Sequence, residues 1–158
     1  MLRGMRKRAR MLKYTEEVVI DAPAGTIFDV ITDLDAYAQW NPWIVWAEGT
    51  PTQDATIRVK SKVGGRVLRV NHRILSNLPG REFRWCDLGW FTHLAYGQRG
   101  RWLEPRADGR VVYRVELRIT GVLSGLVEAL LGRSLAWGVK AETDALKQRA
   151  EWLARKAA

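Results

Sequence analysis

Few side chains of this chain could act as acids or bases in an apolar environment. His72 and His93 are the two histidines, and a histidine can serve as a general base near neutral pH. Glu142 lies in an apolar stripe of the C-terminal segment, where loss of water makes a carboxylate a stronger base. Tyr113 lies in an apolar run, and its hydroxyl could donate a hydrogen bond to a ligand carbonyl. The candidate catalytic residues are therefore Glu142, His93 and Tyr113.

Other common catalytic and metal-binding arrangements are not recognisable in the sequence. Two histidines without clustered carboxylates do not predict a zinc site, and no Ser-His-Asp grouping can be identified. Cys86 is the single cysteine, and its neighbours Trp85 and Asp87 favour an inert core thiol. The glycines at 64–65 and 97–100 lack the strand-to-helix context of a phosphate-binding loop. We therefore expect no metal and no cofactor.

The elements that position these side chains follow from the spacing of apolar residues. Residues 14–21 form a β-rich run, which Pro23 ends while starting a helix. Helical spacing extends over 24–32 and 34–40, until Pro42 ends the second helix. Apolar residues then alternate with a period of two, which predicts six antiparallel strands joined by short turns. These strands are expected at 43–48, 55–62, 66–76, 81–86, 91–103 and 111–119.

The C-terminal segment predicts one long amphipathic helix. Residues 122–156 contain no proline, and Gly132 marks a kink or a boundary. Either Glu142 or Thr143 belongs to the apolar stripe, depending on the rotation of the helix. At ~1.5 Å per residue, a helix over 134–155 is long enough to cross a sheet.

These elements predict an α+β fold in which a curved antiparallel sheet of about seven strands wraps around the C-terminal helix, with two short helices after the first strand. Only the C-terminal helix is long enough to cover the apolar face of the sheet. Because side chains do not easily fill the space between a curved sheet and a straight helix, we expect a cavity there.

The charge of the chain is unevenly distributed. The net charge is +9 over 158 residues, but six basic and no acidic residues lie in 1–13. We therefore predict a basic, disordered extension over 1–12 and a single domain over 13–156. The domain alone does not favour a nucleic-acid partner, although the extension could contact nucleic acid or an anionic membrane. The sequence leaves the oligomeric state open.

Two further features concern the compartment and the ligand. The longest apolar stretch is about half the ~20 residues that a spanning helix needs, and a single cysteine suits a reducing compartment, so we expect a cytoplasmic protein. Eight tryptophans favour a flat or aromatic ligand.

The order of the elements and three motifs resemble the START/Bet v 1-like (SRPBCC) superfamily, most closely its polyketide cyclase/dehydratase-like branch. The motifs are Asp-Ala-Pro at 21–23, Ile-Phe-Asp-Val-Ile-Thr-Asp at 27–33 and Trp-Asn-Pro-Trp at 40–43. The resemblance extends over nearly the whole chain and implies a helix-grip fold that encloses a hydrophobic ligand cavity. It implies no fixed catalytic residues, because the superfamily includes carriers of sterols, lipids and quinones, hormone binders and cyclases.

Strand alternation and the helical stripe identify the side chains that could line this cavity. Trp40 and Trp43 flank the Asn-Pro break, where the resemblance places the mouth, and could form a gate or a hydrophobic plug. For any single strand residue, the alternative is ordinary core packing. The candidate ligand-binding residues are Trp40, Trp43, Ile57, Val59, Phe83, Trp85, Tyr113, Val115, Leu117, Val139 and Leu146.

Three functional hypotheses follow. The first is a protein that binds a hydrophobic small molecule, such as a lipid, quinone, aromatic or polyketide-like compound. The second is a cofactor-independent polyketide cyclase or dehydratase, in which Glu142 or His93 removes an α-proton and Tyr113 stabilises the enolate. The third is contact of the basic N-terminal extension with nucleic acid or an anionic membrane.

Overall fold

A computed structural model describes residues 10–158. The predicted extension over 1–12, and the hypothesis of a basic arm, concern mainly residues 1–9, which lie outside the described residues. The first strand begins at Leu12, whose side chain is buried, one residue before the predicted start of the domain.

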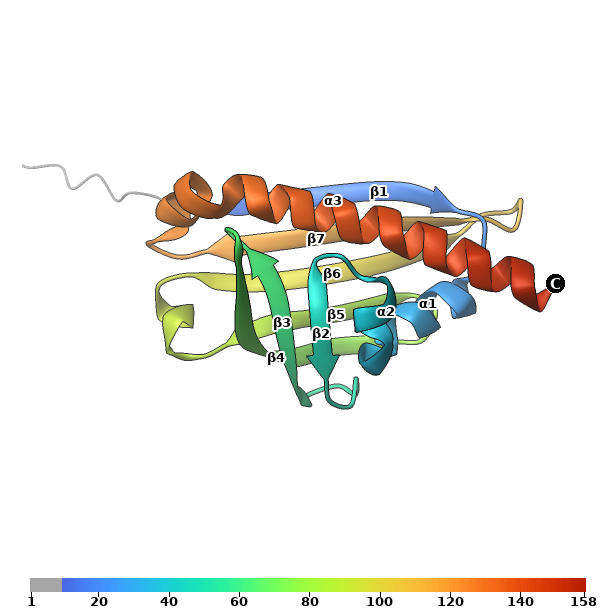
Figure 1. Cartoon of the computed structure of the whole chain (residues 1–158), viewed down its shortest axis with the longest axis horizontal. Coiled ribbons are helices and arrows are strands. Elements are labelled where there is room, and N and C mark those ends of the chain that lie inside the picture. Colours follow the sequence, from blue (N-terminus) through green and yellow to red (C-terminus); the bar gives the residue numbers. More distant parts are fainter. Residues whose placement is uncertain (1–9) are drawn as a thin grey trace, which may run out of the picture.

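Seven strands, three α-helices and two 3₁₀ turns form the described part of the chain (Figure 1). In chain order these are β1 (Leu12–Ile20), α1 (Ala24–Thr32), η1 (Leu34–Ala36), α2 (Tyr37–Trp40), β2 (Ile44–Glu48), β3 (Thr56–Val63), β4 (Arg66–Leu78), β5 (Glu82–Leu88), η2 (Trp90–His93), β6 (Tyr96–Pro105), β7 (Val111–Thr120) and α3 (Ser124–Ala157). This order confirms the predicted helix-grip α+β fold.

The strands form one antiparallel sheet in the order β1-β7-β6-β5-β4-β3-β2. Pairing shifts register between Ile44 and Trp46 and between Ile74 and Ser76, and irregularities of this kind increase strand bending and twist. The helix α3 runs along β1 and β7 on one face of the sheet (Figure 1). The hydrophobic core lies between that face and the helices.

Strand alternation assigns side chains to the two faces of the sheet largely as predicted. On the concave face, Trp85 of β5 pairs with Arg99 of β6, and Phe83 pairs with Arg101. The convex face is charged, and there Glu116 binds Lys13 and Arg118. Two arginines therefore lie on the concave face, where the pattern of the other strands gives apolar side chains.

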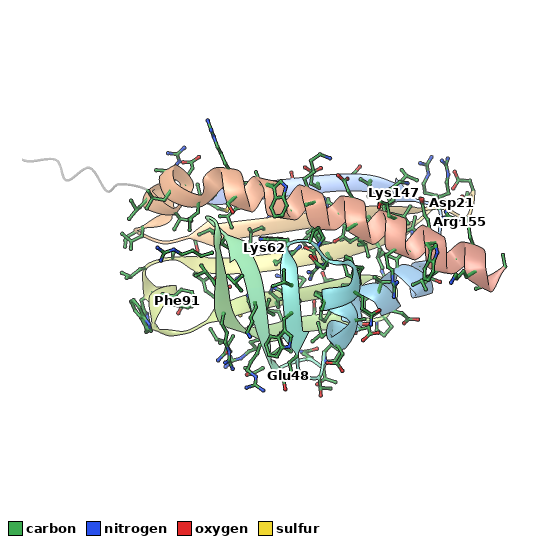
Figure 2. All side chains as sticks on the ribbon, viewed as in Figure 1. Asp21, Glu48, Lys62, Phe91, Lys147 and Arg155 are labelled. Atoms are coloured by element: carbon green, nitrogen blue, oxygen red, sulfur yellow. The ribbon has the colours of Figure 1, made fainter. Side chains whose placement is uncertain are left out.

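The long helix α3 is continuous from Ser124 to Ala157, so Gly132 is not a boundary between two helices. A glycine within a helix costs about 1 kcal/mol relative to alanine, which packing against the sheet can offset. The helix is also anchored to the end of β1: Glu151 accepts a hydrogen bond from the Asp21 amide at 3.0 Å, and Lys147 donates to the Val19 carbonyl at 2.6 Å. Figure 2 shows Lys147 beside Asp21.

The strand predicted at 91–103 begins later, at Tyr96, because the 3₁₀ turn η2 precedes it. Gly89 has φ +139°, a backbone conformation that favours glycine, and the chain then turns through residues 90–93. Figure 2 shows Phe91 of this turn at one end of the molecule. His93 is consequently exposed rather than on the concave face of a strand. None of the described helices is long and apolar enough to cross a membrane.

Candidate ligand-binding site

A cavity of about 150 Å³ lies between the concave face of the sheet and α3. Its volume is close to that of a cavity that binds benzene, and below the ~300–1,000 Å³ of typical small-molecule sites. Most of its wall is apolar, with the main contributions from Trp43, Ile44, Val59, Trp85, Leu117 and Leu135. The polar part of the wall is formed by Ser61, His72, Asp87, Gln98 and Arg99.

The wall residues differ in exposure, and this difference identifies the open and the closed end of the cavity. Leu68, on the hairpin between β3 and β4, is 42% exposed, and Val63 beside it is half-buried. Trp43, Trp85 and Arg99 at the other side are buried. The cavity therefore opens beside the β3–β4 hairpin and closes at Arg99.

A charged cluster lies behind the closed end of the cavity. Glu142 of α3 contacts Arg99 through its Oε2, and its Oε1 accepts a hydrogen bond from Arg101 at 3.0 Å. The three side chains are 1%, 4% and 1% exposed, respectively. Two cations beside one carboxylate favour its ionised form. This arrangement differs from the expected unpaired carboxylate in an apolar cavity, which would have been a stronger base.

Asn41 connects this cluster to the turn between α2 and β2. Its Nδ2 donates to Glu142 Oε1 at 3.0 Å, and its Oδ1 accepts from the amides of Trp43 and Ile44 at 3.0 and 2.9 Å. The asparagine that ends the short helix therefore also fixes the start of β2 relative to α3. Because Trp43 belongs to the same turn, this network also holds one wall of the cavity.

Both buried arginines stack on aromatic rings. The Arg99 guanidinium lies 4.5 Å from the centroid of the Trp43 ring, and that of Arg101 lies 4.3 Å from Trp85. Such contacts are strongest where water is excluded. The aromatic wall thus stabilises the cations and limits their orientation.

Burial changes the protonation equilibria of this region. It lowers the pKa of Arg99, and the charge of Arg101 lowers it further, whereas Tyr113 and Tyr37 act in the opposite direction. Burial also raises the pKa of Tyr113 and of Tyr37, against the opposing effect of both arginines. The two phenols therefore remain protonated near neutral pH and can act as donors. Tyr37 donates to the Ile31 carbonyl.

A histidine-aspartate pair forms another part of the wall. His72 of β4 and Asp87 of β5 are cross-strand partners, and His72 Nε2 lies 3.0 Å from Asp87 Oδ1. The Gly97 amide donates to Asp87 Oδ2 at 3.0 Å, which fixes the carboxylate. His72 Nδ1 is buried and has no hydrogen-bond partner among residues 10–158. A carboxylate that holds one imidazole nitrogen and leaves the other unpaired is an arrangement suited to general base catalysis.

The predicted ligand-binding residues fall into three groups in the structure. Trp43, Val59, Trp85 and Leu117 line the cavity. Trp40 lies in other surface pockets, beside Arg149, so only Trp43 of the two indoles lines the cavity. The remaining candidates are buried in the core and do not line the cavity: Ile57, Phe83, Tyr113, Val115, Val139 and Leu146.

The predicted catalytic residues do not come together at the cavity. Glu142 is paired with the two arginines, Tyr113 is buried near them, and His93 is exposed in η2. Glu142 and Thr143 are both buried, so the helix stripe includes both residues rather than one of them. Within residues 10–158, no group of three or more His, Cys, Asp or Glu side chains could hold a metal ion.

Sequence reasoning missed Arg99, Arg101, Asp87 and Asn41 as site residues. A signal for the arginines was present, because alternation along the strand predicted at 91–103 places Arg99 and Arg101 on the same face as His93, a candidate catalytic residue. Asp87 was considered only as a neighbour of Cys86. Its contact with His72 depends on strand register, which the sequence does not specify directly.

Comparisons with known proteins agree with this geometry. Residues 11–151 match the family model described as polyketide cyclase/dehydrase and lipid transport. No significant match was found among curated protein sequences. The fold is similar to a START superfamily protein from Mycobacterium smegmatis, with 19% identity and a TM-score of 0.70 over 89% of this chain and 98% of that chain.

Two enzymes have a similar fold. The Zhui aromatase/cyclase from Streptomyces sp. R1128 has 17% identity and a TM-score of 0.70 over 93% of this chain and 95% of that chain. A norcoclaurine synthase from Thalictrum flavum has 13% identity and a TM-score of 0.71 over 96% and 99%. At these identities the structural matches establish the helix-grip fold, and the family model accounts for most of the sequence. The chain therefore belongs to the polyketide cyclase/dehydrase and lipid transport family.

Proposed function

We propose that this protein binds a small, planar, largely apolar molecule in the cavity between the sheet and α3. The observation that carries the proposal is an apolar cavity of about 150 Å³ that contains two tryptophan rings and opens beside the β3–β4 hairpin. Binding in such a site removes apolar surface of the ligand from water. Membership of the polyketide cyclase/dehydrase and lipid transport family also supports the binding of a small molecule.

The volume of the cavity selects among the ligands that the family suggests. A cavity of about 150 Å³ holds a single-ring compound but not a sterol or a folded poly-β-ketone. Larger ligands would require the β3–β4 hairpin to move. A one-ring aromatic compound is therefore favoured over a lipid or a long polyketide.

Filling the cavity tests this proposal. Val70 lines the cavity on β4, and phenylalanine there occupies part of the space, so Val70→Phe is expected to weaken ligand binding at least about tenfold. The measurement is quenching of tryptophan fluorescence by a panel of one-ring aromatics, supported by native mass spectrometry. Val67→Phe on the same strand is the control, because Val67 is exposed and lies outside the cavity. If no compound binds, or both variants bind like the wild type, the proposal is wrong.

A second candidate function is acid-base chemistry on the ligand, and the His72–Asp87 pair favours it. In this mechanism His72 Nδ1 removes a proton from the carbon next to a ligand carbonyl. The C–H electron pair becomes the carbon-carbon double bond of an enolate, whose oxygen charge Arg99 stabilises. Asp87 keeps the other imidazole nitrogen protonated and stabilises the imidazolium that forms. The protonated His72 then returns the proton to the carbon.

Exchange of the methyl protons of acetophenone in D₂O, followed by NMR, tests this candidate. A positioned general base contributes about 10²–10⁴-fold, so His72→Gln should reduce catalysed exchange by that factor while binding is retained. His93→Gln provides the comparison, because His93 is exposed in η2. If only His93→Gln abolishes exchange, His93 is the general base, as the sequence analysis proposed, and His72 is excluded. If the wild-type protein does not catalyse exchange, the acid-base function is excluded and the ligand-binding proposal stands alone.

A further inference from the structure

The charges behind the cavity do not balance. The inference drawn from this imbalance rests on the proposed ligand-binding function. Arg99 and Arg101 share the single carboxylate of Glu142, and no other acidic side chain among residues 10–158 forms an ion pair with either arginine. All three groups are more than nine-tenths buried, so the cluster has one positive charge that solvent hardly screens. An uncompensated buried charge is strongly unfavourable.

Asp87 is the acidic residue among the described residues that line the cavity, and it is already engaged. Its two oxygens contact His72 and the Gly97 amide, and its side chain is 25% exposed. It therefore does not replace a buried counter-ion for Arg99.

The same region also has a surplus of hydrogen-bond donors. Arg99 Nε and Trp43 Nε1 both belong to residues of the cavity wall, and both are buried without a hydrogen-bond partner among residues 10–158. Glu142 Oε2 makes no hydrogen bond either, but it lies against Arg99. Buried polar groups normally have partners, and each unpaired donor lowers stability. Neither a guanidinium nor an indole N–H can accept a hydrogen bond, and an acceptor oxygen can satisfy both groups. An anion with acceptor oxygens would compensate the excess charge and would also accept hydrogen bonds from the unpaired donors.

Arg99 is the member of this cluster that belongs to the cavity wall. Its guanidinium stacks on Trp43, and both side chains line the cavity, so a ligand in the cavity meets Arg99 as the cationic group of the wall. Guanidinium and carboxylate groups match in planarity and in hydrogen-bond spacing. We propose that the ligand is a small planar carboxylate, whose ring occupies the apolar cavity and whose carboxylate binds Arg99.

Ligands of equal size and different charge test this inference in the wild-type protein. Benzoate, benzyl alcohol and benzylamine differ mainly in the polar group. A charge-assisted hydrogen bond predicts that benzoate binds about 10–100-fold more tightly than benzyl alcohol, and that benzylamine binds worst. The readout is tryptophan fluorescence, with calorimetry as a second measurement.

Each outcome separates the inference from the proposed function. Equal affinity for benzoate and benzyl alcohol would overturn the anion preference and leave the cavity-binding proposal intact. Binding of none of the three would overturn both.

Substitution of Arg99 gives an independent test. Arg99→Met leaves Arg101 and Glu142 as a balanced pair, so the preference for benzoate over benzyl alcohol should disappear while benzyl alcohol still binds. Arg114→Met is the control, because Arg114 lies on the convex face over Trp102. A preserved preference in Arg99→Met would overturn the assignment of the carboxylate to Arg99. If Arg99→Met does not fold, the comparison of ligands in the wild type decides the question.

Discussion

Replacing Glu142 with glutamine is expected to lower the free energy of unfolding by about 3–5 kcal/mol. Glutamine keeps the size of the side chain and can still accept a hydrogen bond from Asn41. It removes the one acidic group among residues 10–158 that pairs with Arg99 and Arg101, and the two cations then lie unpaired in a buried site. The loss comes mainly from the two buried cations left unpaired rather than from lost packing. Urea denaturation followed by circular dichroism measures it.

An exposed acid on the same helix provides the control. Asp144 pairs with Lys140 at 2.9 Å, and both side chains are largely in solvent, so Asp144→Asn should change stability very little. In the Arg99→Met background, Glu142→Gln should cost less than in the wild type, because only one cation then remains. Small and equal losses for Glu142→Gln and Asp144→Asn would contradict a stabilising role for the cluster.

Two glycines of α3 are expected to respond to alanine with opposite signs. A Cβ at Gly138 would lie 2.3 Å from the ring of Trp43, which is buried and stacked on Arg99. Overpacking of this kind costs about 1–3 kcal/mol, which exceeds the gain of about 1 kcal/mol from the better helix propensity of alanine. Gly138→Ala should therefore destabilise the protein, displace Trp43 and weaken ligand binding.

Gly125→Ala is the matched control, because a Cβ there meets nothing within 4 Å. It should stabilise the protein by up to about 1 kcal/mol and leave ligand binding unchanged. Thermal unfolding and the emission maximum of tryptophan fluorescence distinguish the two variants. Equal stabilisation by both would show that Trp43 can move away from α3 without cost. The prediction that the cavity wall is rigid would then be wrong.

Local features of the sequence were sufficient for most of the fold. The period-two alternation predicted the strands, proline predicted the ends of the first elements, and the absence of proline predicted the C-terminal helix. The errors are also local. Gly132 does not interrupt α3, and η2 replaces the first residues of the expected strand at 91–103. In both cases packing and turn geometry outweigh a short-range signal.

The candidate site was predicted only in part, because periodicity gives the face of a residue but not its depth or its partner. Val59, Trp85 and Leu117 line the cavity, whereas Tyr113 on the same face is covered by neighbouring side chains. A charged residue on the concave face is favourable only if a compensating group arrives from another element. The sequence does not show that Glu142 provides this for Arg99.

The sequence by itself therefore determined the order of the elements, the faces of the strands and the family to which the chain belongs. The tertiary structure decided which polar groups meet. His72 and Asp87 become neighbours through the register of β4 and β5, and Glu142 reaches Arg99 because α3 crosses the concave face. Alternation and helical spacing are properties of neighbouring residues, whereas these contacts join residues that are far apart in the chain and close only after the sheet curves around the helix.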